Sequence, residues 1–156
     1  MNSPTYLDGD ESRSINLGSV KYLTGPAGSH GFAGDYTIAM RVYRITGSSS
    51  YLVMAQNSGT GGTSRNYEIQ FDTTKSQFIV YKATSGGQVT ANGPVVAGNV
   101  WSTLLVQFDG ATRKAGISVN DSAITESSAL ATVPNNDASF SLSIGISTVF
   151  IPPRNV

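Results

Sequence analysis

The sequence contains no cysteine, and charged residues make up only 13% of its 156 positions. Without cysteine there is no thiol catalysis, no thiolate metal site and no disulfide, although a secreted animal domain of this size would often carry one. This absence favours a prokaryotic or viral chain folded in the cytosol. Glycine, Ser, Thr and Asn take the place of the missing charged residues. This composition suits short strands and turns better than helices.

The chain also lacks an excess of either charge and any long apolar run. Ten basic residues balance ten acidic ones, and no basic cluster provides the electrostatic footprint of a nucleic-acid binder. No stretch approaches the roughly 20 apolar residues of a membrane span. The first ten residues show no signal-peptide pattern. We therefore expect no nucleic-acid partner and no membrane partner.

Alternating apolar residues predict about ten short strands. Residues 36–44 form a clear strand, and residues 51–56 are apolar on both faces, which predicts a central strand. Residues 67–71 and 78–81 predict a hairpin, and residues 140–146 alternate most regularly. In the first of these strands, the expected inward side chains are Tyr36, Ile38, Met40 and Val42. With no convincing helix, the pattern predicts an all-β antiparallel sandwich.

Residues 95–121 carry the most specific pattern in the chain. A loop with Gly98 leads to Trp101, which opens an apolar strand, and Asp109-Gly110 then turns the chain into a second short strand. This order resembles the signature of the laminin G-like and concanavalin A-like jelly rolls. The resemblance implies a jelly-roll fold and a family that mostly binds ligands. Asn120-Asp121 stands where that family has Asn-Gly, which puts a strict type I′ turn in doubt.

The resemblance extends over most of the chain and predicts one domain at residues 1–148. Residues 149–156 contain two adjacent prolines, which cannot occupy a central strand. We expect these residues to form a tail or the start of an unfinished last strand. An open sheet edge invites pairing with another subunit, so a homo-oligomer is expected.

The residues do not predict an enzyme. Related glucanases place several carboxylates on one strand, whereas Glu68 and Asp72 are separated by the amide Gln70. Glu68 and Gln70 are expected to form a solvated strand face. His30, the single histidine, lies in a glycine-rich loop, and no Gly-x-Ser-x-Gly elbow is present.

Sugar binding would need aromatic rings together with amides and hydroxyls. Tyrosines on outward or ambiguous strand faces and polar residues expected in rim loops are the candidates: Tyr43, Asn57, Arg65, Asn66, Tyr81 and Asn92. Trp101 is expected in the core at a sheet corner. No cofactor is required, but many relatives of this fold bind calcium at the rim, and Asp10 and Asp35 are the candidate ligands.

Two functions remain open. The first is a surface or assembly module of a virus particle, such as a bacteriophage decoration, fibre or tail-associated protein. It would be located on the virion surface and would bind neighbouring virion proteins or host glycans. The alternative is a carbohydrate-binding lectin or an accessory module of a larger secreted enzyme, located outside the cell or on its surface.

Overall fold

The structure, a computed structural model, describes residues 5–8, 13–16, 23–27, 32–44, 50–56, 65–71, 73–82, 87–136 and 140–146. Every regular element among them is a strand. The strands are β1 (Thr5–Asp8), β2 (Arg13–Asn16), β3 (Leu23–Ala27), β4 (Tyr36–Tyr43), β5 (Ser50–Gln56), β6 (Arg65–Phe71), β7 (Ser76–Tyr81), β8 (Gln88–Gly93), β9 (Trp101–Asp109), β10 (Lys114–Val119), β11 (Thr125–Glu126) and β12 (Ser141–Ile146). No helix in this part of the chain has the length and hydropathy needed to cross a membrane.

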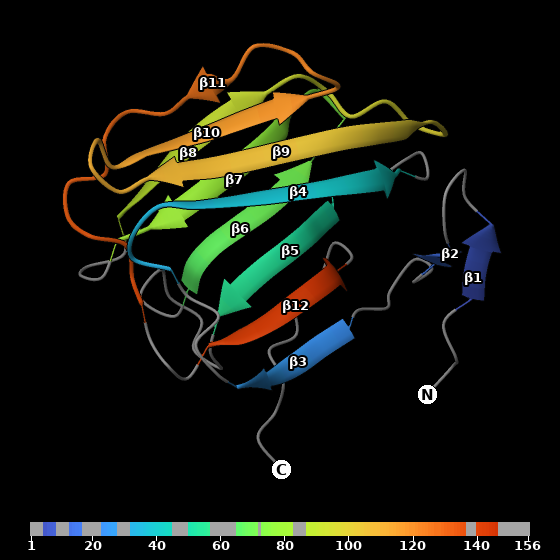
Figure 1. Cartoon of the computed structure of the whole chain (residues 1–156), viewed down its shortest axis with the longest axis horizontal. Helices are drawn as coiled ribbons and strands as arrows, with labels where there is room; N and C mark the ends of the chain where they lie inside the picture. The colour runs from blue at the N-terminus through green and yellow to red at the C-terminus, as the bar shows by residue number, and fades with distance from the viewer. Residues whose placement is uncertain are drawn as a thin grey trace.

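The strands form two facing sheets and one small hairpin. One sheet has four strands in the order β11-β10-β9-β4, and the other has six in the order β3-β12-β5-β6-β7-β8. Strands β1 and β2 pair with each other, and every pairing between named strands is antiparallel. The two sheets lie as layers, with β4 and β9 crossing in front of β6 and β7 (Figure 1). This arrangement confirms the predicted all-β sandwich of the jelly-roll type.

Alternation along β4 and β9 fixes which side chains enter the core. In β4 the even-numbered residues from 36 to 42 are more buried than their odd-numbered neighbours. Leu104, Val106 and Phe108 point inward from β9, and Ile38 and Met40 pair directly with Val106 and Leu104. Such cross-strand pairs stabilise a sheet because their side chains pack on one face. The predicted inward face of β4 is therefore confirmed.

The core lies between the two sheets. The six-stranded sheet supplies aromatic and aliphatic residues from β6, β7 and β8, and the four-stranded sheet supplies β9 and β10. A fully buried Phe, Ile or Leu side chain contributes about 1.5–3 kcal/mol to folding. The largest fully buried apolar side chains are Phe78, Phe140, Ile69, Leu104, Ile117 and Leu130. Strand β5 lies between β12 and β6, so its predicted central position is confirmed.

The turn after β10 has a left-handed backbone conformation at both of its central residues. Asn120 and Asp121 have φ values of 50° and 60°, and the amide of Ser122 donates to the carbonyl of Val119 at 3.1 Å. Positive φ at both central residues defines a type I′ turn, which matches the twist of the flanking strands. The doubt about this turn was therefore wrong, because Asp tolerates the left-handed region well enough to replace Gly.

Two elements differ from their sequence patterns. Ser143 in β12 is buried whereas Ile144 is 39% exposed, so the regular alternation at 140–146 does not give a uniform apolar inner face. Residues 125–136, whose mostly polar sequence shows no clear alternation, contain β11 and otherwise irregular chain. Ile124, just before this segment, packs over β10, where a Cβ on Gly116 would lie 2.8 Å from it. The predicted tail at 149–156 lies outside the described residues.

Candidate functional site

A β-bulge in β6 brings polar side chains together on the outer face of the six-stranded sheet. Ala55 pairs with Tyr67, but the next residue of β5, Gln56, pairs with Arg65. Asn66 is therefore an extra residue in β6, and bulges of this kind redirect the side chains beside them. Tyr67 faces the core, whereas Glu68 points to the opposite face, and the bulge places Arg65 on the same side as Glu68.

Arg65, Glu68 and Tyr81 form a charged cluster on this face. Arg65 Nη1 lies 2.5 Å from Glu68 Oε1 as an ion pair, and it also donates to the Tyr81 hydroxyl at 3.2 Å. The Tyr81 hydroxyl donates in turn to Glu68 Oε2 at 2.8 Å. The guanidinium carbon lies 5.7 Å from the centroid of the Tyr81 ring. Each member therefore fixes the other two.

Burial shapes the titration of this cluster. Glu68 is only 1% exposed, and this desolvation raises the pKa of its carboxyl, although Arg65 and the Tyr81 hydrogen bond both favour the ionised form. Burial, together with the charge on Glu68, also raises the pKa of Tyr81 well above its ordinary value. The side chain of Arg65 remains 21% exposed, although its Nε is buried.

Asn66 joins β6 to two loops at this end of the sheet. Its side-chain carbonyl accepts from the amide of Phe32 at 3.1 Å, and its NH₂ donates to the carbonyls of Phe32, at 3.0 Å, and of Asn135. Asn135 completes the junction by donating its NH₂ to the carbonyl of Arg65 at 3.1 Å and its backbone amide to the carbonyl of Tyr81 at 2.9 Å. Asn66 is completely buried, so its role is structural.

Three side-chain amides form a row across the same face, here called the amide row: Gln70 of β6, Gln77 of β7 and Asn92 of β8. These residues are direct neighbours in the sheet register. Gln70 Nε2 donates to Gln77 Oε1 at 2.9 Å, and Gln77 Nε2 donates to Asn92 Oδ1 at 2.8 Å. Asn92 is exposed and the two glutamines are half-buried. Because Gln70 follows Glu68 by two residues, the row begins about 7 Å from the charged cluster.

The predicted site residues do not all meet. Arg65, Asn66 and Tyr81 lie together, and Asn92 shares their sheet, but all four belong to strands and not to rim loops. Tyr43 lies on the outer face of the other sheet, 41% exposed. Trp101 lies beside it and is half-buried, so its predicted core position was wrong: Trp101 alternates with the buried Ser102 and Leu104 and therefore faces outward.

The structure does not test the two proposed calcium ligands as a pair, because one of them lies outside the described residues. Asp35 is exposed, and its Oδ1 accepts from the amide of Gly110 at 2.6 Å, which ties the start of β4 to the β9–β10 turn. Asp10 and Asn57 lie outside the described residues, as does His30. Among the described residues, no group of three or more His, Cys, Asp or Glu side chains gathers at one point. Calcium binding therefore stays a prediction.

Sequence reasoning missed four residues of this face. Glu68 was wrongly assigned to a solvated surface, and Gln70, Gln77 and Asn135 were not selected. Period-two alternation places Gln70 with Glu68, and it places Gln77 with Tyr81, so the shared faces were available as a signal. The pairing register that aligns three amides, and the burial that encloses Glu68, depend on contacts between distant segments.

The family model described as "Concanavalin A-like lectin/glucanases superfamily" matches residues 17–150. The chain belongs to this superfamily. Its match covers all of the sheet strands from β3 to β12, including the amide row and the charged cluster. No curated protein matches the sequence.

Several solved structures share the fold of this concanavalin A-like chain. Domain 4 of the arabinanase AbnA from Geobacillus stearothermophilus, in complex with arabinotriose, is 12% identical with a TM-score of 0.66, covering 97% of this chain and 70% of its own. The CBM40 of a Ruminococcus gnavus sialidase, bound to α2,3 sialyllactose, is 12% identical with a TM-score of 0.58, covering 78% of each chain. Mouse laminin α1 LG4-5 is 16% identical with a TM-score of 0.56, covering 93% of this chain and 40% of its own.

Proposed function

We propose that this chain is a non-catalytic carbohydrate-binding module whose glycan lies across the outer face of the six-stranded sheet. The amide row is the observation that carries the proposal. A carboxamide offers both donors and an acceptor, and sugar hydroxyls need both. Gln70, Gln77 and Asn92 hold one another by hydrogen bonds, so their orientation is set before a ligand arrives. Preorganisation of this kind reduces the entropy lost on binding.

The charged cluster gives this face a defined end. Arg65 is held by Glu68 and Tyr81, which fixes its partly exposed side chain beside the row. A fixed guanidinium donates strong, directional hydrogen bonds to ring or hydroxyl oxygens. The proposed glycan therefore contacts Arg65 at one end and Asn92 at the other.

The similar structures favour carbohydrate binding over an assembly role. Two of them hold an oligosaccharide, arabinotriose in one and α2,3 sialyllactose in the other, and both exceed a TM-score of 0.5. Of the two functions inferred from the sequence, this supports the carbohydrate-binding one. Nothing in the comparisons points to a virus particle, so the virion assignment, its surface location and its protein partners stay predictions, as does the homo-oligomer.

The acidic residues support a binding role without catalysis. Glycoside hydrolysis uses two carboxyl groups on either side of the scissile bond. Glu68 is the only acidic residue in the six strands of this sheet, and both of its oxygens face Arg65 or Tyr81. Its remaining role is to hold Arg65 in place.

A glycan array probed with the purified protein tests the proposal, once with calcium and once with chelator. Binding in both conditions supports a carbohydrate-binding module without a metal. Binding that needs calcium supports the same function and adds a metal site. Absence of binding in both conditions contradicts the proposal and favours the assembly role.

Variants then locate the binding face. Gln77→Ala interrupts the amide row at its centre, and Asn92→Ala removes its exposed end. Each lost hydrogen bond contributes about 0.5–1.5 kcal/mol, so we expect affinity for the array-selected glycan to fall by roughly 3- to 10-fold. Thr37→Ala, an exposed change on the other sheet, is the matched control and should leave affinity unchanged. Unchanged binding in both amide variants would show that the glycan lies elsewhere.

A further inference from the structure

The outer face of the four-stranded sheet carries an aromatic patch that the proposed glycan site does not use. Tyr43 of β4 and Trp101 of β9 are direct register partners, with ring centroids 5.5 Å apart and planes at 63°. Arg41 lies on the same face, and its guanidinium carbon is 5.5 Å from the centroid of the Trp101 ring. We call these three residues the Trp101 patch.

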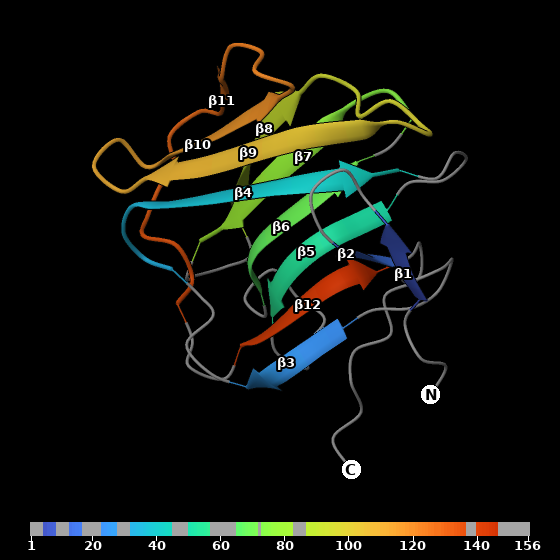
Figure 2. The same ribbon diagram turned by 45° about the vertical axis from the view of Figure 1, so that its right-hand side comes forward.

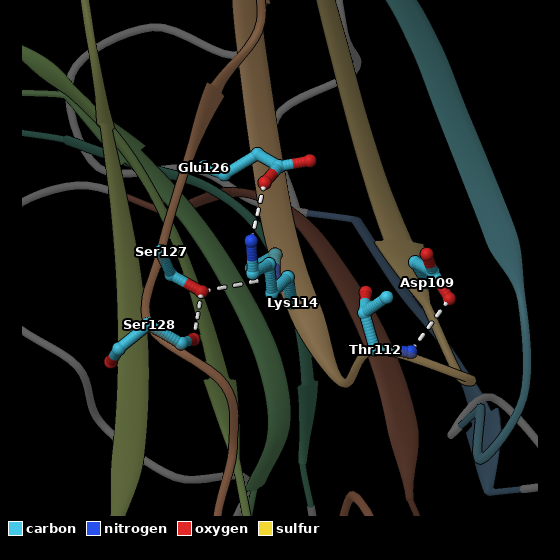
Figure 3. A network of polar contacts seen from close by, with 7 residues as sticks. Asp109, Thr112, Lys114, Glu126, Ser127 and Ser128 are labelled. Atoms are coloured by element: carbon cyan, nitrogen blue, oxygen red, sulfur yellow. Dashed lines mark hydrogen bonds and ion pairs between the residues drawn. The ribbon is translucent and has the colours of Figure 1, made fainter.

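The two halves of this sheet face differ in how they are covered. Over β10 and β11, Lys114 pairs with Glu126 at 2.9 Å, and Ser127 accepts from the amide of Ala115 (Figure 3). Ile124 packs on β10 in the same region. Figure 2 shows that β11 lies beside β10, at the opposite edge of this sheet from β4. The Trp101 patch therefore lies on the open half.

Arg41 is a cation without a counter-ion among the described residues. It is exposed, and neither of the two ion pairs found there includes it. Asp109 is the only carboxylate in β4 and β9, and it lies eight residues from Trp101 along β9, about 26 Å away. The complement to this patch is therefore a carboxylate carried on a group that also packs against aromatic rings.

The size of the patch indicates what carries that carboxylate. Arg41 and Tyr43 lie two residues apart on β4, about 7 Å, and Trp101 lies one strand spacing, roughly 5 Å, from Tyr43. One pyranose ring can cover an area of this size. The C–H face of a pyranose packs on aromatic rings while its carboxylate pairs with the guanidinium. We propose that Arg41, Tyr43 and Trp101 form a second binding site, specific for a carboxylated sugar residue. This site is independent of the amide row, because it lies on the opposite sheet.

The single tryptophan of the chain makes the proposal directly measurable. Trp101 emission is followed while trigalacturonate or sialyllactose is added, and methyl-esterified trigalacturonate and lactose are the neutral controls. We expect a saturable change with the carboxylated sugars and binding at least about tenfold weaker for the neutral ones, since a fixed Arg–carboxylate pair is lost. Arg41→Gln should weaken binding of the carboxylated sugars to a similar extent. Arg41→Lys should fall between, because lysine keeps the charge and loses the planar fork.

Several outcomes would overturn the proposal. They are an absent response to both carboxylated sugars, equal binding of the methyl ester, and an Arg41→Gln variant that binds like the parent. An equal response to hexaglutamate would assign the patch to acidic peptides instead. Gln77→Ala should leave the response intact, so failure here is distinguishable from failure of the proposed glycan face. Unchanged thermal midpoints would show that the exposed Arg41 variants are folded.

Discussion

At the scale of single residues, the clearest prediction concerns Glu68, because its buried environment disfavours the ionised carboxylate. Burial raises its pKa, so the folded state holds the proton more tightly than the unfolded state. The contribution of Glu68 to stability is then greatest below the unfolded pKa of about 4.3, and this contribution is lost as pH rises through the folded pKa. Relative to Glu68→Gln, the parent should lose unfolding free energy between pH 4 and pH 7. Denaturant unfolding at several pH values measures this difference.

Tyr81→Phe provides the matched comparison for Glu68. The Tyr81 hydrogen bond lowers the pKa of Glu68, so its removal should raise that pKa further and extend the loss of stability to higher pH. If the parent and Glu68→Gln instead show parallel pH profiles, the ion pair with Arg65 balances the burial of the carboxyl.

Asn66 should be a strong structural position although it lies among the predicted binding residues. Asn66→Ala removes its hydrogen bonds with Phe32 and Asn135 and leaves a void in the bulge. Buried polar groups left without a partner cost about 1–3 kcal/mol, and we expect a loss near 2 kcal/mol in thermal or denaturant unfolding. Asn92→Ala, at an exposed position, should change stability by less than about 0.5 kcal/mol. Equal effects at both positions would contradict the structural role.

At the scale of elements, the turn after β10 offers a test of local geometry. Asp121 adopts a φ of 60°, which glycine reaches without steric cost. Asp121→Gly should therefore stabilise the protein by about 0.5 kcal/mol, and Asp121→Val should destabilise it by about 1–2 kcal/mol, because a Cβ is unfavourable in this region. Thermal unfolding compares the three proteins. A stable Val variant would mean that the hairpin tolerates another turn.

The strands differ in how far their features could be predicted from the sequence. Strand β4 and its inward side chains were predictable, because alternation is a local signal that survives in any sandwich. The bulge at Asn66 was not, since it depends on how β6 aligns with β5. The family resemblance suggested a core position for Trp101, and this was wrong. Trp101 lies three residues before the buried Leu104, so alternation along β9 puts its side chain on the opposite, outer face. The candidate residues Arg65, Asn66 and Asn92 were expected in rim loops and instead lie in strands.

At the scale of the whole molecule, the sandwich separates two surfaces of different chemistry. The outer face of the six-stranded sheet offers amides and the Arg65 guanidinium, held by Glu68 and Tyr81. The four-stranded sheet offers two aromatic rings and the Arg41 guanidinium, which has no ion pair within the described part of the chain. The packed sheets are about 10 Å apart between their backbones, so side chains on their outer faces lie farther apart still. A ligand on one face therefore has no direct contact with a ligand on the other.

This separation predicts additive behaviour. Substitutions more than 7–10 Å apart without shared partners combine additively to within about 0.5 kcal/mol. A Gln77→Ala and Arg41→Gln double variant should therefore lose as much affinity for the array-selected neutral glycan as Gln77→Ala alone. It should lose as much affinity for trigalacturonate as Arg41→Gln alone. Calorimetric titration of each ligand, in the absence and presence of the other, measures both affinities. If the two ligands compete, the molecule has one shared site, and the two-surface arrangement is wrong.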